Sequence, residues 1–130
     1  MTPAQSSILI VDDEPAVRTA LRVNLRKAGY RVHLAETAEQ GFQLLQIEPV
    51  DLVLSDVKMP GAGGLELLKS IRTHWPQLPV VMMTGHGSVE DAVEAIKNGA
   101  SDYIIKPISR DELLVILKRA LRSRALEEEV

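Results

Sequence analysis

The sequence predicts an α/β fold in which strand and helix alternate five times, a (βα)5 unit built around one parallel sheet. Three observations predict it. Short apolar runs rich in β-branched residues recur along the chain, segments with apolar residues at helical spacing separate them, and the connections are short. Because crossovers between parallel strands are right-handed, the helices are expected on both faces of a doubly wound sheet.

The predicted strands are short and follow one another at regular intervals. They comprise residues 8–11, 31–35, 52–54, 80–83 and 103–105. Four of them are unbroken apolar runs, which are typical of strands buried on both faces of a parallel sheet. The second strand alternates polar and apolar side chains instead, as a half-exposed strand does. We therefore expect the second strand to be covered on one face only.

The predicted helices lie between the strands, where apolar side chains recur every three to four positions. They comprise residues 17–28, 38–45, 65–75, 89–96 and 113–121. Residues typical of helix ends flank them, namely Thr37, Ser88 and Ser109 before helices and Gly29, Pro76 and Gly99 after helices. Glu112 follows Ser109 by three residues, a spacing that predicts a capping box.

The composition is that of a folded domain. Hydrophobic residues make up 45% and charged residues 25% of the chain, which argues against disorder. A net charge of −3 and an isoelectric point near 5.6 argue against direct nucleic-acid binding by this domain on electrostatic grounds. The absence of cysteine excludes disulfides, thiolate metal sites and a cysteine nucleophile, and it suits the cytoplasm. The longest apolar runs are too short to cross a membrane, so no membrane association is expected.

The 130 residues suit one domain with short extensions. We expect residues 1–7 to form a loose amino-terminal arm and residues 8–122 to form the folded domain. Residues 123–130 favour a helix but have little to bury. They are expected to begin a linker helix toward an output domain outside this sequence.

Polar groups follow the apolar runs at the predicted carboxyl ends of the strands. Asp12 and Asp13 follow the first strand, Asp56 the third, Thr84 the fourth and Lys106 the fifth. In doubly wound sheets, ligands bind at this edge. Carboxylate oxygens suit Mg²⁺, and the lack of histidine or cysteine ligands here argues against zinc.

The carboxylates, the lysine and the threonine at this edge together predict phosphoryl transfer. A carboxylate beside Mg²⁺ can attack phosphorus and form an aspartyl phosphate, and Asp56 is the candidate nucleophile. Lys106 and Thr84 can neutralise and hydrogen-bond the transferred group. Taken singly, these residues have ordinary explanations: Asp13 as a helix cap, Asp56 as a turn former and Lys106 as a surface lysine. Their placement at four strand ends favours a site.

These motifs, from Asp12-Asp13-Glu14 to Lys106-Pro107, resemble the receiver domain of bacterial two-component response regulators. The resemblance implies a flavodoxin-like fold with strand order 2-1-3-4-5. The loop sequences at residues 59–68 and 84–87 are most similar to those of NtrC-like, sigma-54-dependent regulators. One departure is Gly63, where the pattern often has aspartate.

The resemblance also implies residue roles. Asp56 is the implied phosphoacceptor for a sensor histidine kinase. The implied Mg²⁺ ligands are Asp12, Asp13, Asp56 and the backbone carbonyl of Lys58. The implied phosphate-binding residues are Thr84, Gly85 and Lys106, and the implied switch pair is Thr84 with Tyr103. The implied output is an ATPase domain and a DNA-binding domain that regulate transcription.

The charge pattern predicts a homodimer. The helix at residues 88–98 is acidic and the helix at residues 109–124 is basic, and the resemblance places both beside the last strand on the output face. The charged residues expected in the dimer face are Glu90, Asp91, Glu94, Lys97, Lys118, Arg119 and Arg122. Such a face is self-complementary across a two-fold axis.

Three other functions compete with this interpretation. A degenerate receiver would serve only as a docking module, without phosphorylation. A small Mg²⁺-dependent phosphatase with an aspartyl nucleophile would need an acid two residues after Asp56, where Lys58 stands. We expect no enzymatic activity beyond the chain's own phosphotransfer and autodephosphorylation. A flavodoxin-like cofactor binder is disfavoured, because the carboxylates after the first strand would repel a phosphate.

Overall fold

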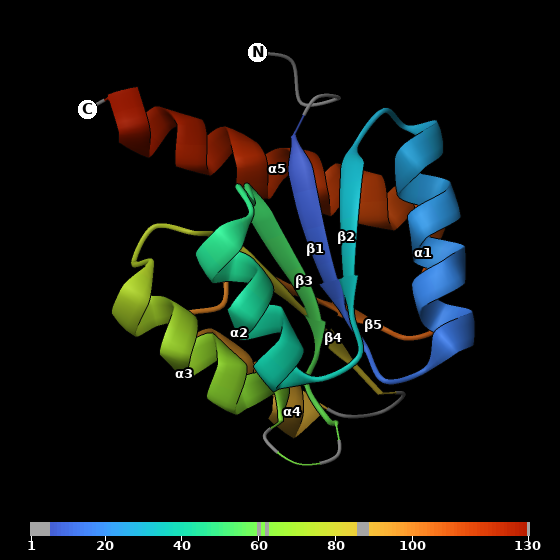
Figure 1. Cartoon of the computed structure of the whole chain (residues 1–130), viewed down its shortest axis with the longest axis horizontal. Helices are drawn as coiled ribbons and strands as arrows, with labels where there is room; N and C mark the ends of the chain where they lie inside the picture. Colours follow the sequence, from blue (N-terminus) through green and yellow to red (C-terminus); the bar gives the residue numbers. More distant parts are fainter. Residues whose placement is uncertain (1–5, 60, 62, 86–88, 130) are drawn as a thin grey trace.

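The computed structural model describes residues 6–59, 61, 63–85 and 89–129, with side chains described as far as residue 123. A five-stranded parallel sheet has the order β2-β1-β3-β4-β5 (Figure 1). Helices cover both of its faces. This arrangement confirms the predicted doubly wound, flavodoxin-like fold.

The strands lie close to their predicted positions. They are β1 (Ser7–Val11), β2 (Arg31–Ala35), β3 (Leu52–Asp56), β4 (Val80–Thr84) and β5 (Asp102–Ile105). Every residue of β1, β3 and β4 is buried. The prediction of deep burial was wrong for β5, where Tyr103 is 38% and Ile105 39% exposed, because β5 is an edge strand and only one of its faces is covered.

The helices match the predicted segments and extend several of them. They are α1 (Pro15–Lys27), α2 (Ala38–Ile47), α3 (Gly64–His74), α4 (Val89–Lys97) and α5 (Arg110–Glu129). The Thr37 hydroxyl caps α2 by accepting from the Gln40 backbone N–H at 3.0 Å, as predicted. The backbone N–H of Glu112 lies 3.5 Å from Ser109 Oγ, at the limit of a capping bond. Ser88, the expected cap of α4, lies outside the described residues.

The core has two layers, one on each face of the sheet. On one face, the side chains of β1, β3 and β4 pack against α1 and α5, with Leu25 and Leu113 fully buried. On the other face they pack against α2, α3 and α4, with Leu68 and Ile71 fully buried. None of the described helices is long and apolar enough to cross a membrane.

The folded unit begins earlier than residue 8. Ser6 and Ser7 are buried, although both were expected in the loose arm. The Ser6 carbonyl accepts from the Arg31 backbone N–H at 3.0 Å, and the Ser7 backbone N–H donates to Asp51 Oδ2 at 2.8 Å. These bonds extend the pairing of β1 by a residue beyond the apolar run that identified it.

Candidate functional site

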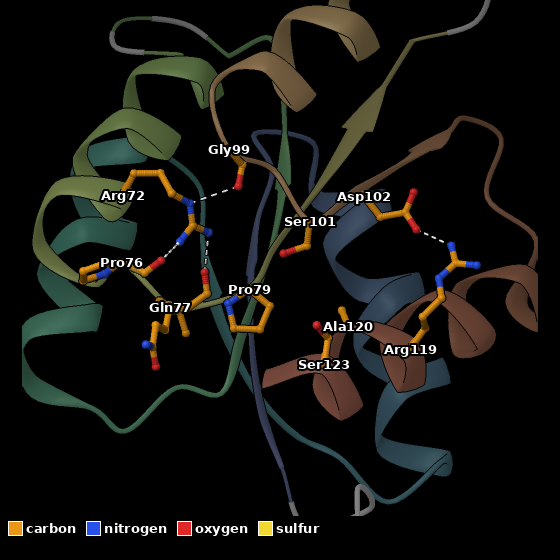
Figure 2. A pocket seen from close by; sticks show the side chains of 11 residues that line it. Arg72, Pro76, Gln77, Pro79, Gly99, Ser101, Asp102, Arg119, Ala120 and Ser123 are labelled. Atoms are coloured by element: carbon orange, nitrogen blue, oxygen red, sulfur yellow. Dashed lines mark hydrogen bonds and ion pairs between the residues drawn. The ribbon is translucent and has the colours of Figure 1, made fainter. Parts of the chain in front are cut away.

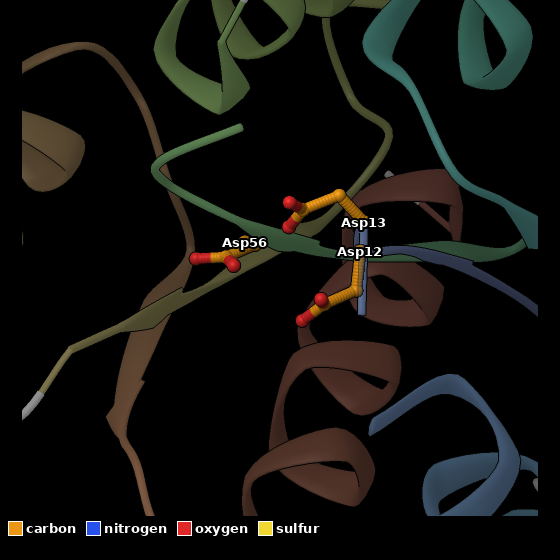
Figure 3. Close-up of side chains that lie close together, drawn as sticks. All are labelled: Asp12, Asp13 and Asp56. Carbon is orange, nitrogen blue, oxygen red and sulfur yellow. The ribbon is translucent and has the colours of Figure 1, made fainter. Parts of the chain in front are cut away.

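The predicted strand-end residues do meet at the carboxyl edge of the sheet. Asp12 and Asp13 follow β1, and Asp56 is the last residue of β3, the neighbour of β1. Figure 3 shows the three side chains close together. Each offers a carboxylate oxygen, and these oxygens lie within 4.8 Å of one another. The parallel register produces this cluster, because Val11 pairs with Ser55 and the next residue of each strand is an aspartate.

Lys106 joins two of these carboxylates. Its Nζ lies 3.0 Å from Asp12 Oδ2 and 3.0 Å from Asp56 Oδ2. Glu14 Oε1 is 3.7 Å from the same nitrogen. Glu14 was part of the acidic run in the sequence, but its contact with Lys106 was not predicted. The ammonium thus offsets the repulsion between negative groups that the strand ends bring together.

Asp56 and Lys106 both have shifted pKa values. Burial raises the pKa of the Asp56 carboxyl, and this outweighs the hydrogen bond and positive charge of Lys106, which lower it. Burial lowers the pKa of the Lys106 ammonium group, but the hydrogen bonds and charges of Asp56 and Asp12 raise it by more. The Asp56 side chain is 10% exposed and that of Lys106 20%, so desolvation acts more strongly on the carboxyl. Lys106 therefore keeps its charge at neutral pH.

Local hydrogen bonds fix Asp12, while Asp13 stays accessible. Asp12 is fully buried, and its Oδ1 accepts from the Glu14 backbone N–H at 2.9 Å. The Asp12 carbonyl accepts from Arg18 Nη1 at 2.7 Å. Asp13 is not buried. A buried, anchored carboxylate and an accessible one therefore stand beside Asp56.

Thr84 ends β4 with a buried hydroxyl. Thr84 is fully buried, and its Oγ1 has no hydrogen-bond partner among the described residues. Its carbonyl accepts from the Lys106 backbone N–H at 2.9 Å, which places it beside the lysine. Met83, the residue before it, pairs with Asp56 across the sheet. Thr84 is thus a hydroxyl donor at the same edge with no acceptor.

Two other predicted residues are exposed. A Cβ added to Gly85 would meet nothing within 4 Å, so the described residues do not require glycine there for space. Tyr103 lies on the outer part of β5, and its backbone N–H donates to Asp102 Oδ1 at 2.9 Å. In this state the ring is not packed inward toward Thr84, as a buried switch residue would be.

The loop after β3 depends on Gly64, a residue to which sequence reasoning gave no role. A Cβ on Gly64 would lie 1.9 Å from the carbonyl oxygen of Asp56, which is far inside contact distance. The Gly64 backbone N–H donates to the Val57 carbonyl at 2.9 Å. The Gly63-Gly64 pair was the available signal. The start of α3 therefore packs directly against the backbone of Asp56.

Lys58 contacts both the Asp56 carboxylate and α4. Its backbone N–H points to Asp56 Oδ1 at 3.4 Å, and its Nζ lies 3.4 Å from Asp91 Oδ2. Asp91 was expected in the dimer face but forms this ion pair within the chain. Arg119, expected in the same face, pairs with Asp102 within the chain.

The carboxylate cluster can hold a divalent metal ion. Hard cations such as Mg²⁺ take oxygen ligands and keep several waters, so one or two carboxylates beside solvent suffice. Asp13 supplies an accessible carboxylate, and Asp12 and Asp56 supply buried ones. The donor chemistry and the spacing of the oxygens fit such an ion.

Comparison with known proteins gives consistent matches. A family model described as the response regulator receiver domain matches residues 8–118. Transcriptional regulatory protein ZraR of Klebsiella oxytoca is 44% identical over 128 residues, which cover 98% of this chain and 29% of ZraR. Regulatory protein AtoC of Escherichia coli K12 is 40% identical over 127 residues, which cover 98% of this chain and 28% of AtoC. The chain therefore spans less than a third of the length of these curated relatives.

Solved structures agree. NtrX from Brucella abortus, in complex with ADP, superposes with a TM-score of 0.93 at 37% identity, covering 96% of this chain and 29% of that chain. A CheY-like response regulator receiver domain protein from Methanospirillum hungatei superposes with a TM-score of 0.89 at 35% identity. That match covers 95% of this chain and 98% of the other, so nearly the whole of both chains shares one fold.

Proposed function

The chain belongs to the family of response regulator receiver domains, with NtrC-like, sigma-54-dependent regulators as its relatives, and we propose that it is a switch phosphorylated on Asp56. One observation carries the proposal. Lys106 bridges Asp12 and Asp56 at 3.0 Å from each, at the edge where the buried Thr84 hydroxyl has no hydrogen-bond partner within the described part of the chain. A phosphoryl group on Asp56 would give both Lys106 and Thr84 an anionic acceptor.

The proposed reaction is a phosphoryl transfer from a sensor histidine kinase. An Asp56 carboxylate oxygen attacks phosphorus, and the bond from phosphorus to the donor's imidazole nitrogen breaks. The nitrogen keeps the electron pair and takes a proton from solvent, and the product is an acyl phosphate. The phosphoryl group carries about −1.5 to −2 charges. Because the Asp56 carboxylate gives up its own charge on forming the acyl phosphate, the edge of the sheet becomes more negative by only about one charge or less.

The chain's own residues would stabilise that charge. The Lys106 ammonium already lies beside Asp56, and the Thr84 hydroxyl can donate to a phosphoryl oxygen without losing another bond. Asp12, Asp13, Asp56 and the Lys58 backbone carbonyl are the proposed holders of Mg²⁺. When bound, Mg²⁺ supplies further positive charge beside the transferring group.

The proposed output is a change of the α4-β5-α5 face. This face exposes apolar side chains from all three elements: Val89, Val93, Ile96, Tyr103, Ile105 and Val115. The same elements expose charges of both signs, including Glu94 on α4 and Lys118 on α5. A homodimer through this face would couple phosphorylation to ATPase and DNA-binding output domains, with Tyr103 moving as Thr84 binds the phosphoryl group. We place this function in the cytoplasm, as a signalling module and not a metabolic enzyme.

Intact mass spectrometry with acetyl phosphate tests the proposal. The chain should gain one phosphoryl group in the presence of Mg²⁺ and none in its absence. Asp56→Asn should gain none, while Asp51→Asn, a matched change of a carboxylate at the opposite edge of the sheet, should behave as the parent chain. No gain at saturating donor would favour a docking module. Continuous hydrolysis of a phosphate monoester, which the chain's own phosphotransfer and autodephosphorylation do not explain, would favour a phosphatase.

A further inference from the structure

The two ends of α4 are held in different ways. At its carboxyl end, the Arg72 side chain reaches from α3 to the backbone that follows α4 (Figure 2). Arg72 Nε donates to the Gly99 carbonyl at 3.0 Å, and Nη1 donates to the Pro76 carbonyl at 2.7 Å. Nη2 donates to the Leu78 carbonyl, just before β4. One guanidinium thus ties the end of α4 to α3 and to the start of β4.

The turn at this end also has little freedom to move. Gly99 has φ +99°, a conformation that other residues rarely adopt, and an added Cβ would lie 2.8 Å from the Arg72 side chain. The Ser101 backbone N–H donates to the Val80 carbonyl at 2.8 Å. The arginine, the glycine turn and the sheet therefore fix the carboxyl end of α4 as one unit.

The body and first turn of α4 are held more weakly. The helix buries only two residues among those described, Ala92 and Ala95, and both are small. Val89 in the first turn is 66% exposed. Since stabilisation by burial scales with apolar area, two alanines hold a helix less firmly than the leucines and isoleucine of α3 do.

An ion pair connects the first turn to the phosphoacceptor loop. Lys58 Nζ lies 3.4 Å from Asp91 Oδ2, with the lysine side chain 81% and the aspartate 22% exposed. The Lys58 backbone N–H faces Asp56 Oδ1 at 3.4 Å. One residue therefore contacts the acceptor through its backbone and α4 through its side chain.

We propose that the Lys58–Asp91 ion pair is a latch that holds the first turn of α4 in the unphosphorylated chain. A phosphoryl group on Asp56 draws the Lys58 ammonium away from Asp91, and α4 then pivots about its end at Arg72 and Gly99. This inference rests on the proposed function. A solvent-accessible ion pair shifts an equilibrium, here between the held and released positions of the first turn of α4, by at most about fivefold. A doubly charged phosphoryl group can overcome a preference of that size.

Hydrogen exchange of the full chain tests the latch. Without phosphorylation, Asp91→Asn should speed exchange at the amides of the first two turns of α4 by about two- to fivefold, and leave residues 99–101 unchanged. Glu90→Gln is the matched control, because it removes an equal charge from the same turn without touching Lys58. The double variant Lys58→Asp/Asp91→Lys should restore slow exchange. Equal effects of Asp91→Asn and Glu90→Gln, or faster exchange at residues 99–101, would overturn the latch.

A second arm adds acetyl phosphate and Mg²⁺, with intact mass read on the same samples. Phosphorylation should speed exchange in the first turns of the parent chain but add little to Asp91→Asn, where the latch is already open. Equal increases in both chains would overturn the role of Lys58 in the response. If no phosphoryl group is gained, the proposed function fails and the phosphoryl-driven release fails with it, while the first arm still decides whether the ion pair holds α4.

Discussion

Two hydroxyl groups in the described part of the chain are buried without a hydrogen-bond partner, those of Tyr30 and Thr84. They lie in different settings. Tyr30 belongs to the core between the sheet and α1 and α5, where burial raises the pKa of its phenol. Thr84 lies at the carboxyl edge beside Lys106. Burial without a hydrogen bond is unfavourable for both hydroxyls. Only the Thr84 hydroxyl has a proposed ligand, the phosphoryl group on Asp56.

Removing either hydroxyl should stabilise the fold, but only one removal should affect function. We expect Tyr30→Phe and Thr84→Val each to raise the free energy of unfolding by about 1 kcal/mol, because an unpaired buried hydroxyl costs about 1–3 kcal/mol. Phosphorylation by acetyl phosphate should be unchanged in Tyr30→Phe and slower in Thr84→Val. Urea unfolding and intact mass measure the two effects. Destabilisation by Tyr30→Phe would show that the Tyr30 hydroxyl does have a hydrogen-bond partner in the folded chain.

The close approach of Gly64 to the Asp56 carbonyl predicts that adding a methyl group at Gly64 destabilises the fold much more than adding one at Gly63. Gly64→Ala should lower the free energy of unfolding by about 3 kcal/mol, because backbone faces the new Cβ and must shift. It should also slow phosphorylation, because the shift moves Asp56. Gly63→Ala is the control: its Cβ would lie 3.4 Å from the Val57 carbonyl, an ordinary contact. Equal losses of stability in the two variants, measured by urea unfolding, would contradict this interpretation.

The raised pKa of Asp56 predicts a pH dependence of stability. Because burial raises this pKa in the folded state, ionisation of Asp56 costs more in the folded chain than in the unfolded chain. Its contribution is favourable below the ordinary value of 3.8 and is lost as the pH rises through the raised pKa. The stability of Asp56→Asn relative to the parent chain should therefore increase from pH 3 upward and level off above that pKa. Urea titrations from pH 3 to 7 test this, and a difference that shrinks with pH would contradict it.

At the scale of elements, the sequence predicted most of the framework. The central strands and all five helices follow from apolar runs, helical spacing and residues such as Thr37 and Gly29. The exposed face of β5 was missed, because a run of three apolar residues does not reveal which face of the strand a helix covers. The meeting of the strand-end side chains was predictable because parallel strands share one carboxyl edge.

The contacts between loops and helices could not be predicted in this way. Lys58 with Asp91, Arg72 with Gly99, and Gly64 against Asp56 each join segments whose relative positions depend on the whole sheet. No local pattern marks the first two contacts, and only the Gly63-Gly64 pair signals the third. These contacts hold α4 and the loop after β3, so the proposed switching response is less visible in the sequence than the proposed chemistry.

The α4-β5-α5 face predicts the effect of reversing one charge. With acetyl phosphate, we expect Lys118→Glu to weaken dimerisation at least about tenfold, because it places like charges across a two-fold interface. Lys118 is the better test than Arg119, which already pairs with Asp102 within the chain. Lys27→Glu on α1 makes the same change in net charge outside this face. Sedimentation velocity should detect a dimer in the control, and equal dimerisation in both variants would contradict the proposed interface.

At the scale of the whole molecule, the site exists only in the folded chain. Lys106 and Asp12 are 94 positions apart in the sequence, yet their side chains are 3.0 Å apart. The sheet brings them together by placing β1 and β3 side by side and returning the chain after β5 to the same edge. The cluster of Asp12, Asp13, Asp56 and Lys106 belongs to neither core layer. The fold therefore holds the carboxylates close together although their negative charges repel one another.

This dependence on folding predicts how Mg²⁺ affects global stability. An ion that binds only the folded chain should raise the free energy of unfolding by about 1.4 kcal/mol at ten times its dissociation constant, because the unfolded chain separates Asp12 and Asp13 from Asp56. Excess EDTA should reverse the effect. Asp13→Asn should abolish most of it, since it removes the accessible ligand, whereas Asp51→Asn at the opposite edge should keep it. Urea unfolding with and without Mg²⁺ measures these differences, and equal stabilisation of both variants would place the ion elsewhere.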